Sequence, residues 1–201
     1  MTEFWINHPI VLRGEIIRLI PLEMEHFEEL YKAASDKKLW EIIPTDCSQY
    51  EKFNLAYFKS LEERDKGKEY PFIIFHNGTE RIIGSTRLFE IFPEHQKLEI
   101  GWTWIISDYW GTCVNPECKF LLLQFCFEVL KASRVQLKTD VLNLRSRKAI
   151  EEIGATFECV SRKDKIKDDG VPRSAAYYSI IDDEWDRVKS NLQNQLNAFQ
   201  K

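Results

Sequence analysis

Hydrophobic and polar positions along the chain follow two different periods, which predict where strands and helices lie. Alternating positions or short apolar runs predict strands over 11–20, 70–75, 81–91, 97–106, 134–139, 155–162 and 173–181. Apolar residues spaced three and four apart predict helices over about 21–35, 48–64, 115–131, 144–153 and 183–199. The order of these elements predicts an α+β fold, with a central sheet of about seven strands flanked by helices.

Turn signals between the strands predict how the sheet is connected. Asn77 and Gly78 separate two predicted strands, and an Asn-Gly pair is a strong signal for a β-hairpin. Pro93 opens the next turn, so the three strands between 70 and 106 are expected to pair in sequence as antiparallel neighbours. The helix over 115–131 then crosses to the strand over 134–139, which implies a parallel partner for that strand. The predicted sheet is therefore mixed and mostly antiparallel.

The helix over 115–131 is apolar on most of its circumference, so we expect it to lie deeply buried against the sheet. Asn115 has the side chain of an N-cap, and Pro116 suits the first helical position. Glu117 complements the positive end of the helix dipole. In the next helix, Gly154 stands where a C-cap is expected.

The start of the helix over 115–131 follows closely on a strand that carries one carboxylate, Glu99. Free backbone N–H groups at a helix start bind anions, and the Thr112 hydroxyl and the Lys119 ammonium could join them around a pyrophosphate. The N–H groups expected to be free are those of Cys113, Val114, Glu117 and Cys118. The residues alone leave two interpretations open: a nucleotide-like cofactor beside a carboxylate base, or an ordinary strand-to-helix connection with a good cap.

Composition narrows the class of protein. The chain has 201 residues, of which 44% are hydrophobic and 30% charged, which suits one domain over 1–201 with its core over about 11–185. A net charge of −4 argues against a general nucleic-acid-binding role, although Arg145, Arg147 and Lys148 could meet a phosphate. The longest apolar run, over 120–130, is too short to span a membrane, and the acidic residue at position 3 is unlike a secretory signal.

Cysteine and histidine usage predicts a reduced, metal-free protein. The five cysteines, at positions 47, 113, 118, 126 and 159, are an odd number and scattered, which suits free thiols and a cytoplasmic location. Cys113 and Cys118 lack a second pair of Cys or His residues at ligand spacing, so no metal site is expected.

Three segments match a known pattern. LEIGWTW, over 98–104, resembles a strand that bears a catalytic glutamate, and YWGTCVNPECKFLLLQFCFEVL, over 109–130, resembles a loop and helix that bind the pyrophosphate of coenzyme A. NLRSRKAIEEIGA, over 143–155, resembles an N-x-x-S segment that approaches the pantetheine. With the order of elements from about Leu12 to Trp185, they resemble the GNAT superfamily of acyl-CoA N-acyltransferases. In detail, the chain resembles the RimJ/RimL-like branch, which acetylates ribosomal-protein N-termini.

The chain departs from the GNAT pattern at two places. The family's Q/R-x-x-G-x-G/A signature falls on 110–115, where Trp110, Cys113 and Asn115 replace the first position and both glycines, which allow close approach to phosphate. The tyrosine that many members use as a general acid corresponds to Ile150. Ser146 matches a serine that has this role in the ribosomal branch.

The resemblance implies an enzyme that moves an acetyl group from acetyl-CoA to a primary amine, with Glu99 as general base, directly or through water. It also implies that Ser146 or solvent protonates the leaving thiolate and that Asn143 orients the pantetheine. The residues alone fit helix-capping roles for both, and a salt-bridged strand carboxylate for Glu99. The implied cofactor contacts are Trp104, Ile105, Ile106, Gly111, Thr112, Cys113, Val114, Asn115, Lys119, Asn143 and Ser146.

The acceptor and partners stay open at this point. A protein N-terminal α-amine and a small polyamine or amino sugar fit equally well, and the acidic residues that could face a cationic acceptor are Glu90, Glu94 and Asp140. A second interpretation is a non-catalytic coenzyme A-binding or protein-interaction module, favoured by the altered loop and the missing tyrosine. Phe4 and Trp5 are expected to pack on a second subunit, as in a homodimer, or on the chain's own sheet.

Overall fold

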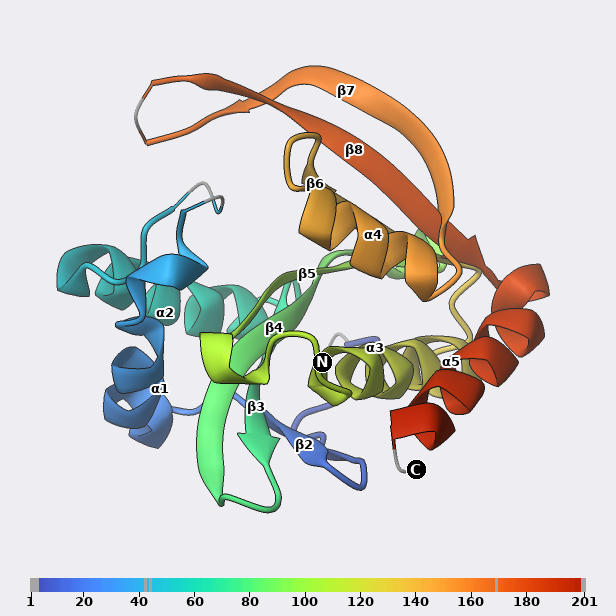
Figure 1. Ribbon diagram of the computed structural model, residues 1–201, viewed down its shortest axis with the longest axis horizontal. Coiled ribbons are helices and arrows are strands. Elements are labelled where there is room, and N and C mark those ends of the chain that lie inside the picture. Colours follow the sequence, from blue (N-terminus) through green and yellow to red (C-terminus); the bar gives the residue numbers. More distant parts are fainter. Residues whose placement is uncertain (1–3, 42, 44, 169, 200–201) are drawn as a thin grey trace.

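The computed structural model describes residues 4–41, 43, 45–168 and 170–199, and it consists of a central sheet with helices on both faces (Figure 1). The strands are β1 (Leu12–Arg13), β2 (Ile17–Pro21), β3 (Tyr70–His76), β4 (Arg81–Phe92), β5 (Lys97–Ile105), β6 (Arg134–Asp140), β7 (Thr156–Ile166) and β8 (Pro172–Ile181). The helices are α1 (Phe27–Ala34), α2 (Tyr50–Asp65), α3 (Val114–Gln124), α4 (Leu144–Glu152) and α5 (Trp185–Phe199). Residues 1, 3 and 201, on which the predicted domain bounds and N-terminal character rest, lie outside this part of the chain.

The strands of the described residues form one sheet in the order β1-β2-β3-β4-β5-β6-β8-β7. All neighbours are antiparallel except β5 and β6, which are parallel, as the crossover through α3 predicts. The sheet has one strand more than expected because the segment over 11–20 folds into β1 and β2. The N–H of Gly14 donates to the carbonyl of Ile17 at 2.9 Å and closes the turn between them. The long β7–β8 hairpin curves away from the rest of the sheet (Figure 1).

Two hydrophobic cores lie on opposite faces of the sheet. On β3, Ile73 belongs to the core under α1 and α2, whereas Phe72 and Ile74 belong to the core under α3 and α5. This separation follows from strand geometry, since successive side chains point to opposite faces. Figure 1 shows α1 and α2 on one side of the molecule and α3, α4 and α5 on the other.

The bounds of α3 correct the prediction for its start. The helix begins at Val114, with Cys113 in the cap position, and the side chain of Asn115 makes no capping bond. Pro116 is therefore the third helical residue, not the first. The Thr112 hydroxyl takes the capping role, because it accepts a hydrogen bond from the Val114 N–H at 3.3 Å. Beyond Gln124 the helix continues as one π-helical turn, Phe125–Val129.

Two further sequence predictions concern the end of α4 and the packing of Trp5. Gly154 ends α4 with a φ of +92°, so the predicted C-cap is confirmed. Trp5 donates its Nε1–H to the carbonyl of Leu130 at 3.1 Å and packs on the chain's own core.

Among the described residues, no helix has the length and apolar character needed to cross a bilayer.

The pairing of β5 with β6 is short, and this creates the opening that holds the site. Three residue pairs join the two strands, and the last of them is Glu99 with Gln136. Beyond this pair, β5 continues its pairing with β4, and β6 continues its pairing with β8. The point where the strands part, marked by Glu99 and Gln136, is here called the vertex. Past the vertex, one backbone edge of β5 has no strand partner in the described residues.

Candidate active site

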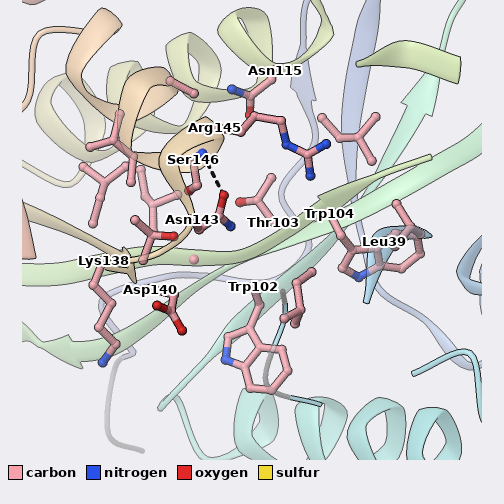
Figure 2. A pocket seen from close by; sticks show the side chains of 18 of the residues that line it. Leu39, Trp102, Thr103, Trp104, Asn115, Lys138, Asp140, Asn143, Arg145 and Ser146 are labelled. Carbon is pink, nitrogen blue, oxygen red and sulfur yellow. Dashed lines mark hydrogen bonds between the residues drawn. The ribbon is translucent and has the colours of Figure 1, made fainter. Parts of the chain in front are cut away.

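A cavity of about 610 Å³ occupies the opening between β5 and β6, a size typical of small-molecule sites. Its walls come from β5, β6, the loop before α3 and the first turns of α3 and α4. Figure 2 shows side chains of β5, such as Trp102 and Thr103, and of α4, such as Asn143 and Ser146, around this cavity. The lining mixes apolar and aromatic side chains with many polar and charged groups, among them Glu99, Asp140 and Arg145.

Glu99 stands at the vertex and lines the cavity, with 1% of its surface exposed. Its Oε2 accepts a hydrogen bond from Gln136 Nε2 at 2.6 Å and lies 3.6 Å from Lys138 Nζ. Burial raises the pKa of the Glu99 carboxyl above its ordinary value, against the opposing effects of the Lys138 charge and the Gln136 hydrogen bond. A buried carboxyl with a raised pKa that faces a cavity is a candidate general base.

The start of α3 has fewer free donors than predicted. The N–H of Glu117 donates to the carbonyl of Cys113 at 2.9 Å, and that of Val114 donates to Thr112 Oγ1. The Thr112 hydroxyl in turn donates to the carbonyl of Tyr109 at 2.8 Å. These groups are therefore bonded within the loop and helix, and the predicted set of phosphate donors is reduced.

The structure divides the cofactor contacts implied by the sequence into two groups. Those that line the cavity are Trp104, Ile105, Gly111, Asn115, Lys119, Asn143 and Ser146. Those outside its lining are Ile106, Thr112, Cys113 and Val114. Ile106 donates its backbone N–H to the carbonyl of Ile83 at 2.9 Å, which explains why it faces β4 instead.

Lys119 is enclosed, with 7% of its surface exposed. Its Nζ donates to Thr103 Oγ1 on β5 at 2.7 Å, and among the described residues no carboxylate forms an ion pair with it. Burial lowers the pKa of the Lys119 ammonium. Because the side chain points inward to β5, this placement does not suit the phosphate contact that the sequence suggested.

Asn143 and Ser146, the two residues of the N-x-x-S segment, lie together at the start of α4. Asn143 Oδ1 accepts a hydrogen bond from the Ser146 N–H at 3.0 Å, drawn as a dashed line in Figure 2, and so caps the helix. Both residues also line the cavity, so the capping role and a ligand contact are compatible. Ile150 lines the cavity one turn later and offers no proton.

Arg145 and Trp110 connect α4 to the loop before α3. The Arg145 guanidinium carbon lies 3.7 Å from the centre of the Trp110 ring, and both residues line the cavity. Trp110 is itself fixed because its Nε1–H donates to the carbonyl of Ile105 at 2.7 Å. Of the basic cluster over 145–148, Arg145 is thus the member that faces the cavity, while Arg147 hydrogen-bonds to the Tyr178 hydroxyl.

The acidic residues suggested for a cationic acceptor lie in different environments. Asp140 lines the cavity, but Arg173 Nε donates to its Oδ2 at 3.2 Å and offsets its charge. Glu90 and Glu94 lie outside the cavity lining. The structure therefore does not gather these three carboxylates around one acceptor.

Sequence reasoning missed several cavity residues. Trp102 lines the cavity with a φ of +50°, at an irregularity in the pairing of β4 with β5. Trp40, on a segment far away in the sequence, packs 5.5 Å from the Trp104 ring. Lys138 lines the cavity from β6, where it and Gln136 alternate with buried apolar residues, and this period-two pattern was the available signal for polar side chains beside the vertex.

The splayed parallel strands, the buried carboxylate between them and the helix that starts beside the cavity define an acetyltransferase. The chain belongs to the GNAT family, since the family's Acetyltransferase (GNAT) domain matches residues 17–156. "Probable N-acetyltransferase YjcK" of Bacillus subtilis (strain 168) is 26% identical over 181 residues, which cover 87% of this chain and 99% of that protein. These findings confirm the predicted N-acetyltransferase class.

Two further comparisons concern the ribosomal branch. "Putative ribosomal N-acetyltransferase YdaF" of Bacillus subtilis (strain 168) is 30% identical over 108 residues, which cover 54% of this chain and 58% of that protein. The structure of Mycobacterium smegmatis RimJ in complex with CoA-disulfide has a TM-score of 0.76 and 17% identity, with 92% of this chain and 91% of that chain covered. At that identity the RimJ structure shows a shared fold.

Proposed function

We propose that the chain transfers an acetyl group from acetyl-CoA to a primary amine, with Glu99 as the general base. The observation that carries this proposal is the position of Glu99: a desolvated carboxyl at the vertex of a cavity large enough for a cofactor arm. The RimJ relative, whose structure contains CoA-disulfide, supports the choice of cofactor.

The residues around the cavity fit acetyl-CoA. The edge of β5 that has no strand partner, beside Trp104, suits an extended pantetheine, which can add to it as a strand would. It ends at Ile105, whose carbonyl accepts the hydrogen bond from Trp110. Asn115 and Arg145 would meet the phosphates near the start of α3, and the Asn143 amide would meet the pantetheine. When bound, acetyl-CoA supplies the thioester whose carbonyl carbon the amine attacks.

Glu99 has a specific task in this proposal. Most primary amines are protonated near neutral pH and cannot attack until they lose a proton. The Glu99 carboxylate takes that proton, directly or through a water molecule in the cavity. Gln136 and Lys138 hold its Oε2, so the carboxyl keeps one orientation while it accepts the proton.

The acceptor is an α-amine at a protein N-terminus or a small amine. The likeness to YdaF favours a protein N-terminus. The wall of the cavity carries both acidic and basic groups, so its charge does not distinguish between the two acceptors. A non-catalytic coenzyme A-binding or interaction module is the second candidate. The internally bonded donors at Thr112, Val114 and Glu117 favour it, because they leave the phosphate loop with fewer free N–H groups.

Calorimetric titration with acetyl-CoA, followed by acetylation of a panel of peptides and small amines, tests the proposal. We expect binding in the micromolar range and a loss of roughly 10²–10⁴-fold in turnover for Glu99→Gln, the range for loss of a general base. Glu28→Gln, an exposed substitution on α1, is the control and is expected to match the native protein. Binding without transfer to any amine would favour the module, and full activity in Glu99→Gln would exclude Glu99 as the base.

A further inference from the structure

Lys119 is a cation in an environment that offers it little compensation. Its ammonium is buried within the wall of the cavity, and it donates a hydrogen bond to an uncharged hydroxyl, Thr103 Oγ1 at 2.7 Å. That oxygen lies 2.8 Å from Thr86 Oγ1, a fully buried hydroxyl. Burying a charge without a counter-charge is costly, so a lysine at this position calls for a functional explanation.

The proposed reaction leaves one proton donor unassigned. When the carbon–sulfur bond breaks, the sulfur retains the electron pair as a thiolate, which is costly to bury unless a proton or a positive charge compensates it. Ile150 stands where a tyrosine would donate a proton and cannot do so. Tyr109 also lines the cavity, but its hydroxyl lies 3.3 Å from Thr79 Oγ1 in the β3–β4 turn. Ser146 offers only an aliphatic hydroxyl, a much weaker acid than an ammonium.

We propose that Lys119 is the general acid that protonates the leaving thiolate of coenzyme A, an inference that rests on the proposed acetyl transfer. The amine nitrogen forms the bond to the acyl carbon, the carbon–sulfur bond breaks, and a proton moves from Lys119 Nζ to the sulfur. Lys119, now a neutral amine, regains a proton from solvent through the cavity. After the attack the nitrogen still carries two protons and a positive charge, and it gives one of them to solvent as the amide forms. The proton that Glu99 removed beforehand also leaves to solvent, so the acceptor loses two protons, the sulfur gains one, Lys119 is restored and one proton is released overall.

The surroundings of Lys119 fit this role. Thr103 Oγ1 holds the Nζ on the β5 side of the opening, while Ser146 and Ile150 line the α4 side. Burial lowers the pKa of the ammonium, which makes it a stronger acid than a surface lysine. The neighbouring Cys118 thiol is neutral, since burial raises its pKa to about 11. Within the part of the chain that the structure describes, no carboxylate forms an ion pair with Lys119 that would stabilise its protonated form.

Three variants and one spectroscopic measurement test the proposal. Lys119→Met removes the proton donor and keeps the length of the side chain, Lys119→Arg keeps a charge that does not give up its proton, and Ser146→Ala removes the competing hydroxyl. The pKa of bound coenzyme A is read from the ultraviolet absorbance of its thiolate, as a difference from the complex with desulfo-coenzyme A. Turnover is measured with acetyl-CoA and with an acetyl thioester of an acidic aryl thiol, whose leaving group needs no proton.

We expect the thiol of bound coenzyme A to have a higher pKa in Lys119→Met than in the native protein, because the nearby ammonium favours the thiolate. Turnover with acetyl-CoA should fall roughly 10²–10⁴-fold in both Lys119 variants, with a much smaller loss for the aryl thioester. Lys119→Met should unfold at no lower temperature than the native protein, since it removes an uncompensated buried charge.

Other results overturn the inference. An unchanged thiol pKa, an equal loss with both thioesters, or a leaving-group-dependent loss in Ser146→Ala instead would each exclude Lys119 as the acid. Acetylation of Lys119 itself, seen as a mass increase after incubation with acetyl-CoA, would make it a nucleophile instead. If the native protein neither binds acetyl-CoA nor acetylates any amine, the proposed function fails and this inference fails with it. If Lys119→Met keeps the full activity of the native protein, Lys119 is not the general acid, while the proposed acetyl transfer stands.

Discussion

Glu117 fixes the β1–β2 turn to the start of α3, and its removal should destabilise the whole fold. Its carboxylate is buried and accepts backbone hydrogen bonds from Glu15 at 2.9 Å, Ile16 at 3.0 Å and Ile17 at 2.7 Å. Gly14 lies so close to this carboxylate that a Cβ at Gly14 would be 2.6 Å from the carboxyl carbon of Glu117. Glu117→Ala therefore leaves three backbone donors without a partner.

The size of the effect follows from how far water can replace the carboxylate. The N–H of Ile17 is buried, so it loses its partner outright, at a cost of about 1–3 kcal/mol. The bonds from Glu15 and Ile16 are partly buried, and water offsets part of their loss. We expect Glu117→Ala to cost about 4 kcal/mol, a large part of the ~5–15 kcal/mol that a typical domain has.

Urea denaturation of Glu117→Ala measures this cost, with a midpoint expected to fall by roughly 1–2 M. Glu28→Ala, on the exposed face of α1, is the control and should change stability by less than about 0.5 kcal/mol. Amide hydrogen exchange should also become faster at Ile16 and Ile17. If Glu117→Ala lowers stability by no more than the control does, the carboxylate does not hold this turn.

Three smaller predictions follow from local contacts. A Cβ at Gly84 would lie 2.1 Å from the carbonyl oxygen of Trp104, so Gly84→Ala should cost about 1–3 kcal/mol in denaturation and weaken acetyl-CoA binding by displacing β5. Because burial raises the pKa of Glu99 in the folded state, its carboxyl favours folding most below its unfolded-state pKa, and this contribution is lost as pH rises through the folded-state pKa. Relative to the native protein, Glu99→Gln should therefore gain more in melting temperature near pH 7 than near pH 4. Trp5→Phe removes the hydrogen bond to Leu130 and should cost about 1 kcal/mol, read from the urea midpoint.

The part of the fold that depends on neighbouring residues could be predicted from the sequence. The three strands over 70–106 and the turns between them match β3, β4 and β5 to within one residue, because hairpin signals and strand periodicity are local. The β1–β2 turn was missed because the group that holds it, Glu117, is about a hundred residues away. Glu117 was correctly placed near the helix start, but its partner could not be read from helix-dipole reasoning.

At the candidate site too, short motifs could be read from the sequence, whereas contacts between distant residues could not. Glu99, Asn143 and Ser146 were found because they occur in short motifs, and all three line the cavity. Lys119 was suggested as a phosphate contact because its ammonium stands near a helix start that could bind a pyrophosphate. The sequence alone does not give the rotation of α3 that turns this residue toward Thr103. Trp102 faces the cavity through a positive φ, which strand periodicity does not predict.

The position of Glu99 explains why a short strand pairing suits acid–base chemistry. If β5 and β6 stayed paired beyond the vertex, the carboxyl would be enclosed by neighbouring strands and could not reach an acceptor amine. If they parted earlier, water would surround it and its pKa would stay near the ordinary value. At the vertex, Gln136 and Lys138 hold the carboxyl on one side while the cavity remains open on the other. The place where the two strands separate therefore sets both the pKa of the Glu99 carboxyl and its access to the cavity, the two properties that the proposed general base requires.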